Sequence, residues 1–517
     1  MVCRNSHLLS LLYSHYDPQM KKSPAGIAPV FAVRKGGPDA LHRQVYNGFR
    51  KGILDGSLRA GQRVPSTRVL AFELGVSRMP VLSAYSQLVA EGYFESRVGS
   101  GTVISRSLPE RAAGAGPAAG SALGRARRIS GDRRRVSKRC LTLSNPGGFH
   151  GSRGCGPFAV SQIAFEEFPL ASWNRLLTRR SRTVQAGSLD YGDPLGLKEL
   201  REAIAAYLRT ARGVRCEAQQ IVIVSGSQQG LELTARVLLD PGDQVWMEEP
   251  GYRFARGVFA GSGCTVVPVT VDAEGLNVTA GAKKGGAARA VLVTPSHQYP
   301  LGVTMSASRR LQLLDWAESN GSWIIEDDYD SEFRYEGMPV TSLQGLDRNS
   351  RVVYIGTFSK VLFPSLRLGY VVVPEDLVER FLAVRFALDI GPPTLHQAVL
   401  TDFIGEGHFA RHIRRMRLLY GERRRALIDN LRRRLGLLVE ITGAEAGMHL
   451  SAILEGIPDR ELCARGARQN LWLVPLSPFY MDKAARHGFV LGYGSTSVEE
   501  IPAAVRALGT LLNLQRS

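Results

Sequence analysis

A lysine and an arginine in the last third of the chain have the types and spacing to bind an aldehyde that carries a phosphate. Ser359 and Lys360 end the segment TFSK at 357–360, directly after a short apolar run. A lysine amine can form an imine with an aldehyde when its surroundings lower its pKa. Arg367 follows seven residues later, and a guanidinium can hold a phosphate through two parallel hydrogen bonds.

The segment IEDDY at 325–329 adds a carboxylate and a phenol after another apolar run. A buried Asp327 can keep a pyridine nitrogen protonated, which turns the heterocycle into an electron sink. Tyr329 can hydrogen-bond the hydroxyl oxygen of the same ring. With an imine-forming lysine nearby, these two side chains predict a pyridine aldehyde as the ligand.

Three more polar segments complete the predicted site. Ser227 and Gln228 lie in SGSQQ at 225–229, at a strand-to-helix junction, where hydroxyls and backbone N–H groups form a cup for an anion. Tyr252 in EPGY can stack on a planar ring, and Tyr299 belongs to the polar loop TPSHQYPLG at 294–302. Each segment alone is weak evidence, because such residues usually serve a turn or a helix cap. Their occurrence in order, each at a strand end, predicts one site.

The elements that must position these residues are short apolar strands that alternate with helical patterns from about residue 158 onward. This alternation predicts an α/β domain with a mostly parallel sheet. Ligands of such sheets bind at the carboxyl ends of the strands. The strands are expected at 221–224, 244–247, 290–293, 323–325 and 352–355.

Length and charge indicate a second, different domain. The 517 residues predict two to four domains. The net charge is +18, and residues 1–150 hold 23 Lys and Arg against 8 Asp and Glu, whereas the remaining 367 hold 42 against 39. A basic end on a nearly neutral chain favours an anionic partner for that end.

The basic end predicts three helices and two short strands. Leu41, Val45, Phe49 and Ile53 recur every four residues in a helix at 41–56. A second helix begins after its N-cap Ser66, with Val69, Leu70 and Leu74 on its inner face. Ser77 is expected to cap a third helix that runs to about Glu91, with Val81, Tyr85, Leu88 and Val89 inward. The strands are expected at 93–97 and 102–104. This order is that of a winged helix-turn-helix, although three helices and a hairpin could also form a plain interaction domain.

The helix starts and the turn between the strands carry the residues that we expect at double-stranded DNA. The second helix of the hairpin would enter the major groove by its N-terminal end, and hydroxyls or backbone N–H groups at helix starts can bind phosphate. The candidate contacts are Ser66, Thr67, Arg68, Ser77, Arg78, Met79, Arg97, Gly99 and Ser100.

The chain therefore divides into a loose leader at 1–37, a DNA-binding domain at 38–104, a flexible basic linker at 105–156 and the α/β domain at 157–517. The linker is rich in Ala, Gly, Pro, Ser and Arg, which cannot bury enough apolar surface to order itself. Six scattered cysteines form no disulfide framework. No apolar run spans a membrane and no export signal is evident, so we expect a cytoplasmic protein.

The basic end resembles the winged helix-turn-helix of the GntR regulator family over 41–104. The matching segments are PSTR at 65–68, LGVSR at 74–78, AEGY at 90–93 and GSGT at 99–102. Pro80 departs from the family, which usually has a small polar residue there. A proline is tolerated in a first helical turn but supplies no hydroxyl to a phosphate.

The larger domain resembles fold-type I aminotransferases, and PSHQYP at 295–300 is similar to the MocR/GabR-type regulators, which fuse such a domain to a GntR-like head. The resemblance implies a smaller C-terminal subdomain beside the parallel sheet. It also implies pyridoxal 5′-phosphate as cofactor, Lys360 as its Schiff-base lysine and Asp327 at its ring nitrogen. It places Tyr329 near the ring oxygen, Tyr252 on the ring face, and Ser227, Gln228 and Arg367 at the phosphate. It also implies a homodimer in which Tyr191 and Gly192 lie near the active site, often that of the partner subunit.

One departure bears on catalysis. True aminotransferases use an arginine near the C-terminus to grip the substrate α-carboxylate, and Val490 stands at that position, with Arg486 nearby. We therefore expect a transcription regulator that binds pyridoxal phosphate and responds to it or to an amino compound. An active aminotransferase with a DNA-binding head is the alternative. A third hypothesis treats the larger domain as a dimerisation scaffold without cofactor.

Overall fold

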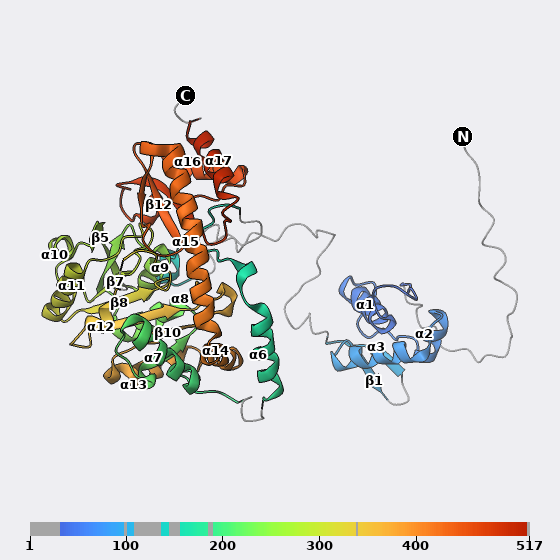
Figure 1. Cartoon of the computed structure of the whole chain (residues 1–517). Coiled ribbons are helices and arrows are strands. Elements are labelled where there is room, and N and C mark those ends of the chain that lie inside the picture. The colour runs from blue at the N-terminus through green and yellow to red at the C-terminus, as the bar shows by residue number, and fades with distance from the viewer. Residues whose placement is uncertain are drawn as a thin grey trace, which may run out of the picture. The chain divides into compact units, whose positions relative to one another are not determined.

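The computed structural model describes residues 31–97, 101–107, 136–143, 156–184, 190–337 and 340–513. The chain forms two compact units, residues 1–133 and 134–517, which we call the head and the body (Figure 1). Most of the predicted leader and of the predicted linker lies outside the described residues, as do Gly99 and Ser100.

The head has the predicted order of elements. Its helices are α1 (Leu41–Leu54), α2 (Thr67–Glu73) and α3 (Arg78–Ala90), and its antiparallel strands are β1 (Phe94–Arg97) and β2 (Gly101–Ile104). The rings of Phe49, Tyr85 and Phe94 meet edge to face at centroid distances of 5.2–5.6 Å. This aromatic core fixes α1 and α3 against the first strand.

Two expectations for the inner faces of the head helices are wrong. Val69 and Val89 are 45% and 41% exposed. In α2, which has only seven residues, Leu70 and Ala71 are the buried residues. In α3 the buried face consists of Val81, Ala84, Tyr85 and Leu88, at the spacing of 3, 4 and 7 that one helix face allows, and Val89 lies about 100° beyond Leu88.

The body is built on an eight-stranded sheet whose spatial order is β3-β10-β9-β8-β7-β4-β5-β6. The strands β9, β8, β7, β4 and β5 are mutually parallel, whereas β10 runs antiparallel to both of its neighbours. The strands are β3 (Ile221–Val224), β4 (Gln244–Glu249), β5 (Thr265–Asp272), β6 (Gly275–Leu276), β7 (Ala290–Val293), β8 (Trp323–Asp328), β9 (Val352–Thr357) and β10 (Gly369–Val372).

Helices follow most of the strands, which is why the chain alternates between the two patterns. The central strands β7, β8 and β9 are buried along nearly their whole length, so their sequences begin as continuous apolar runs. The helices are α6 (Leu170–Arg182), α7 (Lys198–Arg212), α8 (Ser227–Leu238), α9 (Arg253–Ser262), α10 (Val278–Gly285), α11 (Ala307–Asn320), α12 (Leu343–Leu346), α13 (Val378–Leu388) and α14 (Leu395–Gly405).

A smaller C-terminal lobe completes the body, as predicted. It contains a four-stranded antiparallel sheet of order β11-β12-β14-β13. Its elements are the long helix α15 (His408–Leu435), β11 (Glu440–Thr442), β12 (His449–Leu454), α16 (Asp459–Arg468), β13 (Val474–Pro475), β14 (His487–Gly492) and α17 (Ile501–Asn513). No described helix is long and apolar enough to cross a membrane.

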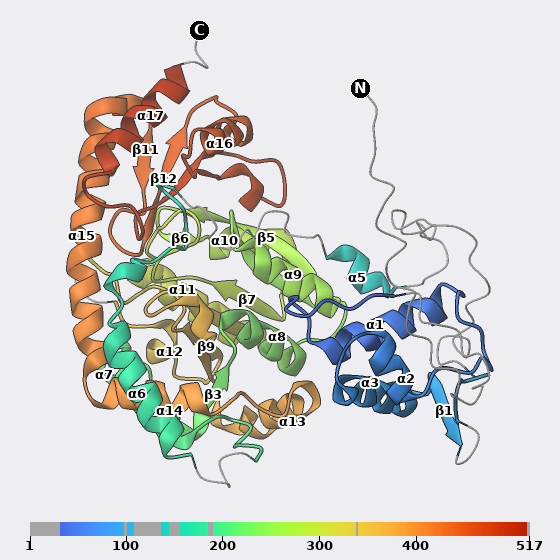
Figure 2. The same cartoon turned by 90° about the vertical axis from the view of Figure 1, so that its right-hand side faces the viewer.

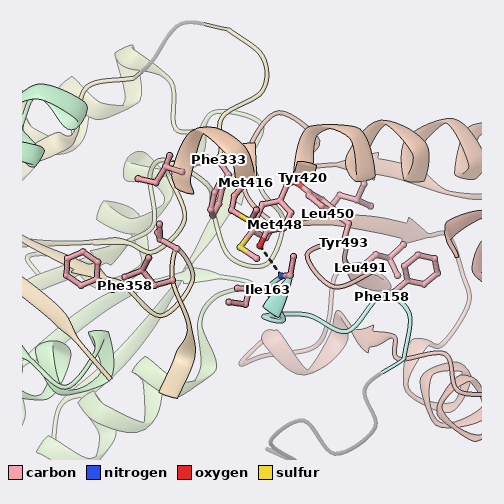
Figure 3. Packing of buried hydrophobic residues seen from close by; sticks show 14 of the residues in the cluster. Phe158, Ile163, Phe333, Phe358, Met416, Tyr420, Met448, Leu450, Leu491 and Tyr493 are labelled. Carbon is pink, nitrogen blue, oxygen red and sulfur yellow. Dashed lines mark hydrogen bonds between the residues drawn. The ribbon is translucent and has the colours of Figure 1, made fainter. Parts of the chain in front are cut away.

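One hydrophobic cluster joins the two lobes of the body (Figure 3). Tyr420 of α15 lies within it and accepts a hydrogen bond at its hydroxyl from the backbone N–H of Ala164, at 3.1 Å. Phe333, which follows β8, meets the Tyr420 ring edge to face at 5.0 Å. The shared core holds the small lobe in a fixed position beside the carboxyl ends of β8 and β9.

The predicted linker contains one described helix, α5 (Lys138–Thr142). Ser137 caps it by accepting a hydrogen bond from the N–H of Cys140 at 3.1 Å. The side chain of Leu143 lies over Gly261 of α9, where a Cβ atom would meet it at 3.3 Å. The end of this segment thus packs on the body, because glycines of α9 leave room for a leucine.

Candidate functional site

A cavity of about 210 Å³ lies at the carboxyl ends of the parallel strands. It is lined by residues that follow β3, β7, β8 and β9, and by Met448 and His449 of the small lobe. All nine residues predicted to bind a cofactor line it, namely Ser227, Gln228, Tyr252, Tyr299, Asp327, Tyr329, Ser359, Lys360 and Arg367. The segments that are far apart in sequence meet here because parallel strands end at one edge of the sheet.

Lys360 lies in the turn that follows β9, on the wall of the cavity. Its burial disfavours the ammonium form and lowers the pKa of the amine to about 8, against the opposing charges of Asp330 and Asp327. The unprotonated fraction of the amine near neutral pH is therefore much larger than for an exposed lysine. That is the form that attacks an aldehyde.

The two aspartates at the end of β8 have different partners. Asp328 binds Arg212, whose Nε lies 2.9 Å away, and the hydroxyl of Tyr354 at 2.5 Å. Asp327 lines the cavity, and its Oδ1 has no hydrogen-bond partner among the described residues. Burial, together with the charges of Asp328 and other carboxylates, raises the pKa of Asp327 to about 7. Asp328 Oδ1 also lacks a partner among the described residues, but Asp328 does not line the cavity, so Asp327 is the carboxylate available to a ligand.

The start of α8 and Arg367 form a cup for an anion. The Arg367 guanidinium donates to the carbonyl oxygen of Ser225 at 2.6 Å. A Cβ atom at Gly226 would lie 3.3 Å from the guanidinium. Gly226 has φ +86° and ψ 170°, a conformation that is almost restricted to glycine. This backbone conformation, together with the absence of a side chain at Gly226, lets the Arg367 guanidinium lie close to the first backbone N–H groups of α8, which favour a bound phosphate.

Aromatic rings close the cavity on another side. The Tyr299 ring lies edge-on to those of Tyr252 and Tyr329, at centroid distances of 5.9 and 6.0 Å. It also contacts Phe479 and His449, at 5.3 and 5.2 Å. These rings offer faces and edges to a planar heterocycle.

The sequence did not single out a buried cluster of His297, Asp330 and His449. His297 Nδ1 lies 3.0 Å from Asp330 Oδ2, and the Tyr329 hydroxyl donates to the His297 carbonyl oxygen at 2.8 Å. His449 Nε2 lies 3.2 Å from the carbonyl oxygen of Pro300. The spacing of the three residues is within the range of metal ligands. His297 Nδ1 and His449 Nε2 already make hydrogen bonds, whereas His297 Nε2 has no partner among the described residues. The cluster contacts Tyr329 through His297. Only His297, inside the polar loop, lay in a segment that the sequence pointed to.

The residues present fit pyridoxal phosphate. Three buried polar atoms on the cavity wall lack a hydrogen-bond partner among the described residues: Gln228 Oε1, Asp327 Oδ1 and Ser359 Oγ. Buried polar groups are nearly always satisfied, so these atoms indicate a polar ligand. Asp327 suits a ring nitrogen, and Gln228 and Ser359 lie with Arg367 on the lining of the cavity.

Neither candidate for a carboxylate-binding group reaches the cavity. Val490 is fully buried in β14, in an apolar cluster with Leu301 and Phe479. Arg486 is exposed and lies 3.5 Å from Glu440. Tyr191 is 81% exposed and does not line the cavity of its own chain.

The DNA candidates of the head gather at the starts of α2 and α3. Ser66 caps α2 and accepts a hydrogen bond from the N–H of Val69, while Thr67 Oγ1 accepts from Arg78 Nε at 3.2 Å. The Arg78 side chain is thus held at the start of α3. Met79 is 68% exposed, and Arg68 is also exposed.

Ser77 precedes α3, but its side chain makes no capping hydrogen bond, contrary to expectation. The reason is Pro80, which occupies the third position of the helix and has no N–H to donate to the cap. The Ser77 hydroxyl therefore stays available to a phosphate. The side chain of Arg97 and the residues Gly99 and Ser100 lie outside what the structure describes.

Comparisons with known proteins identify both units. Residues 41–104 match the family model of bacterial regulatory proteins of the gntR family, and residues 162–504 match that of aminotransferase class I and II. The body is similar to a kynurenine aminotransferase of Pyrococcus horikoshii, with 28% identity and a TM-score of 0.69 over 75% of this chain and 99% of that one.

A second similar structure is the α-aminoadipate aminotransferase LysN of Thermus thermophilus in complex with N-(5′-phosphopyridoxyl)-L-leucine. It is 28% identical with a TM-score of 0.64, and the alignment covers 70% of this chain and 92% of that one.

Similarity to curated relatives extends over both units. The probable rhizopine catabolism regulatory protein MocR of Rhizobium meliloti is 39% identical, over 90% of this chain and 93% of that protein. The regulator TauR of Rhodobacter capsulatus is 33% identical, over 93% and 98%. The pyridoxine biosynthesis transcriptional regulator PdxR of Corynebacterium glutamicum is 31% identical, over 89% and 93%. The chain therefore belongs to the MocR-type transcription regulators, which join a GntR-type winged helix-turn-helix to an aminotransferase class I/II domain.

Proposed function

We propose that this regulator binds pyridoxal 5′-phosphate in its body and that the cofactor, or an amino compound that reaches it, controls DNA binding by the head. The observation that carries the proposal is the single cavity that joins the Lys360 amine, the unpartnered Asp327 carboxylate and the Arg367 cup. These groups match the aldehyde, the ring nitrogen and the phosphate of one molecule.

Each lining residue has a defined part in this proposal. Lys360 binds the aldehyde, Asp327 holds a proton on the ring nitrogen, and Tyr329 faces the ring oxygen. Tyr252 and Tyr299 pack on the heterocycle, while Arg367 with Ser227, Gln228 and Ser359 binds the phosphate. Bound pyridoxal phosphate supplies a carbon that reacts with amines and a ring that accepts electrons.

We propose a cytoplasmic homodimer in which the ligand changes how two heads meet a symmetric operator. The segment of Tyr191, exposed in its own chain, would face the site of the partner subunit. A ligand can shift such an equilibrium only if it binds one arrangement of the heads better than the other. The part of the predicted linker at 105–156 that precedes α5 would act as a tether.

A footprint on the DNA upstream of the chain's own gene, with and without pyridoxal phosphate, tests the proposal. The wild-type protein should change its protection or its affinity when the cofactor is added. Lys360→Ala should abolish that response while retaining basal DNA binding. Lys283→Ala, an exposed lysine of α10, is the matched control and should respond like the wild type. An unchanged response in Lys360→Ala would refute cofactor control.

An active aminotransferase is the second candidate, favoured by the retained Lys360 and Asp327. Against it, the cationic side chains among the described residues that line the cavity are Lys360 and Arg367, both committed to the cofactor, while Val490 is apolar. Loss of a charged hydrogen bond to a substrate carboxylate costs about 1.5–3 kcal/mol. Steady turnover of an amino acid with a keto acid would support the enzyme; a stall after one half-reaction would support the regulator.

A further inference from the structure

The long helix α15 is much richer in positive charge than the rest of the body. Its 28 residues hold ten arginines and two acidic residues, Glu422 and Asp429. The other residues of 151–517 hold 32 Lys and Arg against 37 Asp and Glu. Figure 2 shows α15 running along one edge of the body, from α17 to α14.

Part of this charge has a structural explanation. Arg423 and Arg424 are buried and bind Glu166 and Glu336, respectively. Arg415 pairs with Glu167. These contacts hold the helix against the two lobes, and they account for three of the ten arginines.

Part of the remaining charge forms an exposed stripe, whereas Arg417 donates to the carbonyl oxygen of Glu332. Arg414, Arg425 and Arg432 are exposed, and no ion pair or side-chain hydrogen bond engages them among the described residues. Their separations of 11 and 7 residues are three and two helical turns, so they project on the same side at spacings of about 16 and 10 Å. Arg411, which donates to the carbonyl oxygen of Glu406, and Arg433 are also exposed and flank them, rotated by about 60° and 100° around the helix axis. We call these five residues the α15 stripe.

We propose that the α15 stripe is a second DNA-contacting surface, which binds the phosphate backbone of duplex flanking the operator. The proposal rests on the proposed function, because the head must first bring DNA to the protein. From Arg411 to Arg433 the stripe measures about 33 Å, close to one helical turn of B-DNA. Arginines bind phosphates in a bidentate manner.

The composition of the face fits DNA better than a membrane. An interfacial helix needs an apolar face that it can insert into lipid. The apolar residues of α15 are packed in the core of the body, and Leu418, at 68% exposure, is the exposed large apolar residue of the helix. Glu422 and Asp429 lie within the face, so binding should be moderate, electrostatic and independent of base sequence.

The test compares two DNA lengths and two triple variants of the full-length protein. The short probe is the shortest duplex that the protein selects from a random-sequence pool, and the long probe adds about 30 base pairs on each side. The variant Arg414→Gln, Arg425→Gln, Arg432→Gln removes the unengaged centre of the stripe. The matched control is Arg348→Gln, Arg380→Gln, Arg506→Gln, three exposed arginines of the body outside α15.

We expect the stripe variant to keep the affinity of the wild type for the short probe and to lose the extra affinity for the long probe. Each lost phosphate contact lowers the slope of log affinity against log salt by about 0.9. With three lost contacts, raising the salt from 50 to 200 mM should weaken binding of the variant to the long probe by a factor about 40-fold smaller than for the wild type. The control variant should behave like the wild type on both probes.

Three outcomes would contradict the inference in different ways. Equal binding of both triple variants to the long probe would overturn the α15 surface and leave the proposed function intact. Failure of the wild type to select any duplex would overturn the proposed function itself. Dissociation of the stripe variant into smaller species, measured by light scattering, would show that the stripe is an interface between copies rather than a DNA surface.

Discussion

Replacing Asp327 by Asn should stabilise the ligand-free protein. Burial, together with Asp328, Glu248 and Asp330, raises the pKa of Asp327 from 3.8 to about 7. Between about pH 4 and 7 the folded protein therefore keeps a proton that the unfolded chain has lost. The free energy of unfolding falls as the pH rises through this window and levels off above it. About three pKa units at 1.36 kcal/mol each set an upper limit of roughly 4 kcal/mol for this cost.

The same substitution should weaken cofactor binding. Asparagine carries no charge to hold the proton of the ring nitrogen, and a lost hydrogen bond to a charged group is worth about 1.5–3 kcal/mol, or roughly 10- to 150-fold in Kd. The variant should therefore unfold at a higher temperature than the wild type without cofactor at pH 8, and gain less from added cofactor. Its advantage should shrink by about 1.4 kcal/mol per pH unit below pH 7.

Thermal unfolding at pH 6 and 8 and an absorbance titration with pyridoxal phosphate measure both effects. Asp328→Asn is the control at the neighbouring residue. It removes the counter-charge of the buried Arg212 and should lower the free energy of unfolding by about 3–5 kcal/mol. The reasoning is refuted if Asp327→Asn is no more stable than the wild type at pH 8 and binds the cofactor equally well.

Three further substitutions test other parts of the molecule. Gly226→Ala forces a non-glycine residue into a conformation that costs about 1–3 kcal/mol and crowds the Arg367 guanidinium, so cofactor affinity in an absorbance titration should fall roughly tenfold or more. Phe49→Ala removes the centre of the head's aromatic core and should cost about 3–5 kcal/mol, seen as faster hydrogen exchange in α1 and α3 while cofactor absorbance is unchanged. Thr67→Val removes the acceptor for Arg78 and should weaken DNA binding roughly 2- to 12-fold in a gel-shift titration, and Thr67→Ser should restore it.

Much of the site was predictable because its residues are local to strand ends. The five strands that the sequence predicts are all present as β3, β4, β7, β8 and β9, and the polar segments after them converge because they share one edge of the sheet. The resemblance indicated Asp327 rather than Asp328 as the ligand-facing carboxylate. Strand geometry explains the difference, since adjacent residues of β8 point to opposite faces.

Other features depend on contacts between distant segments. His449 meets His297 at a ring distance of 4.6 Å although 152 residues separate them, and no local pattern in the sequence predicts this pairing. The reversed direction of β10 is set by sheet pairing on both sides. The helix α5 forms in a segment whose composition is typical of a linker, because Leu143 at its end packs on Gly261 of α9.

The central claim is that the amine of one lysine binds the aldehyde of the cofactor. Full-length protein incubated with pyridoxal phosphate, treated with borohydride and digested should yield one peptide with a stable phosphopyridoxyl mass at Lys360. If the label is absent, or is found on exposed lysines and not on Lys360, the account of the body as a cofactor-binding regulator is contradicted.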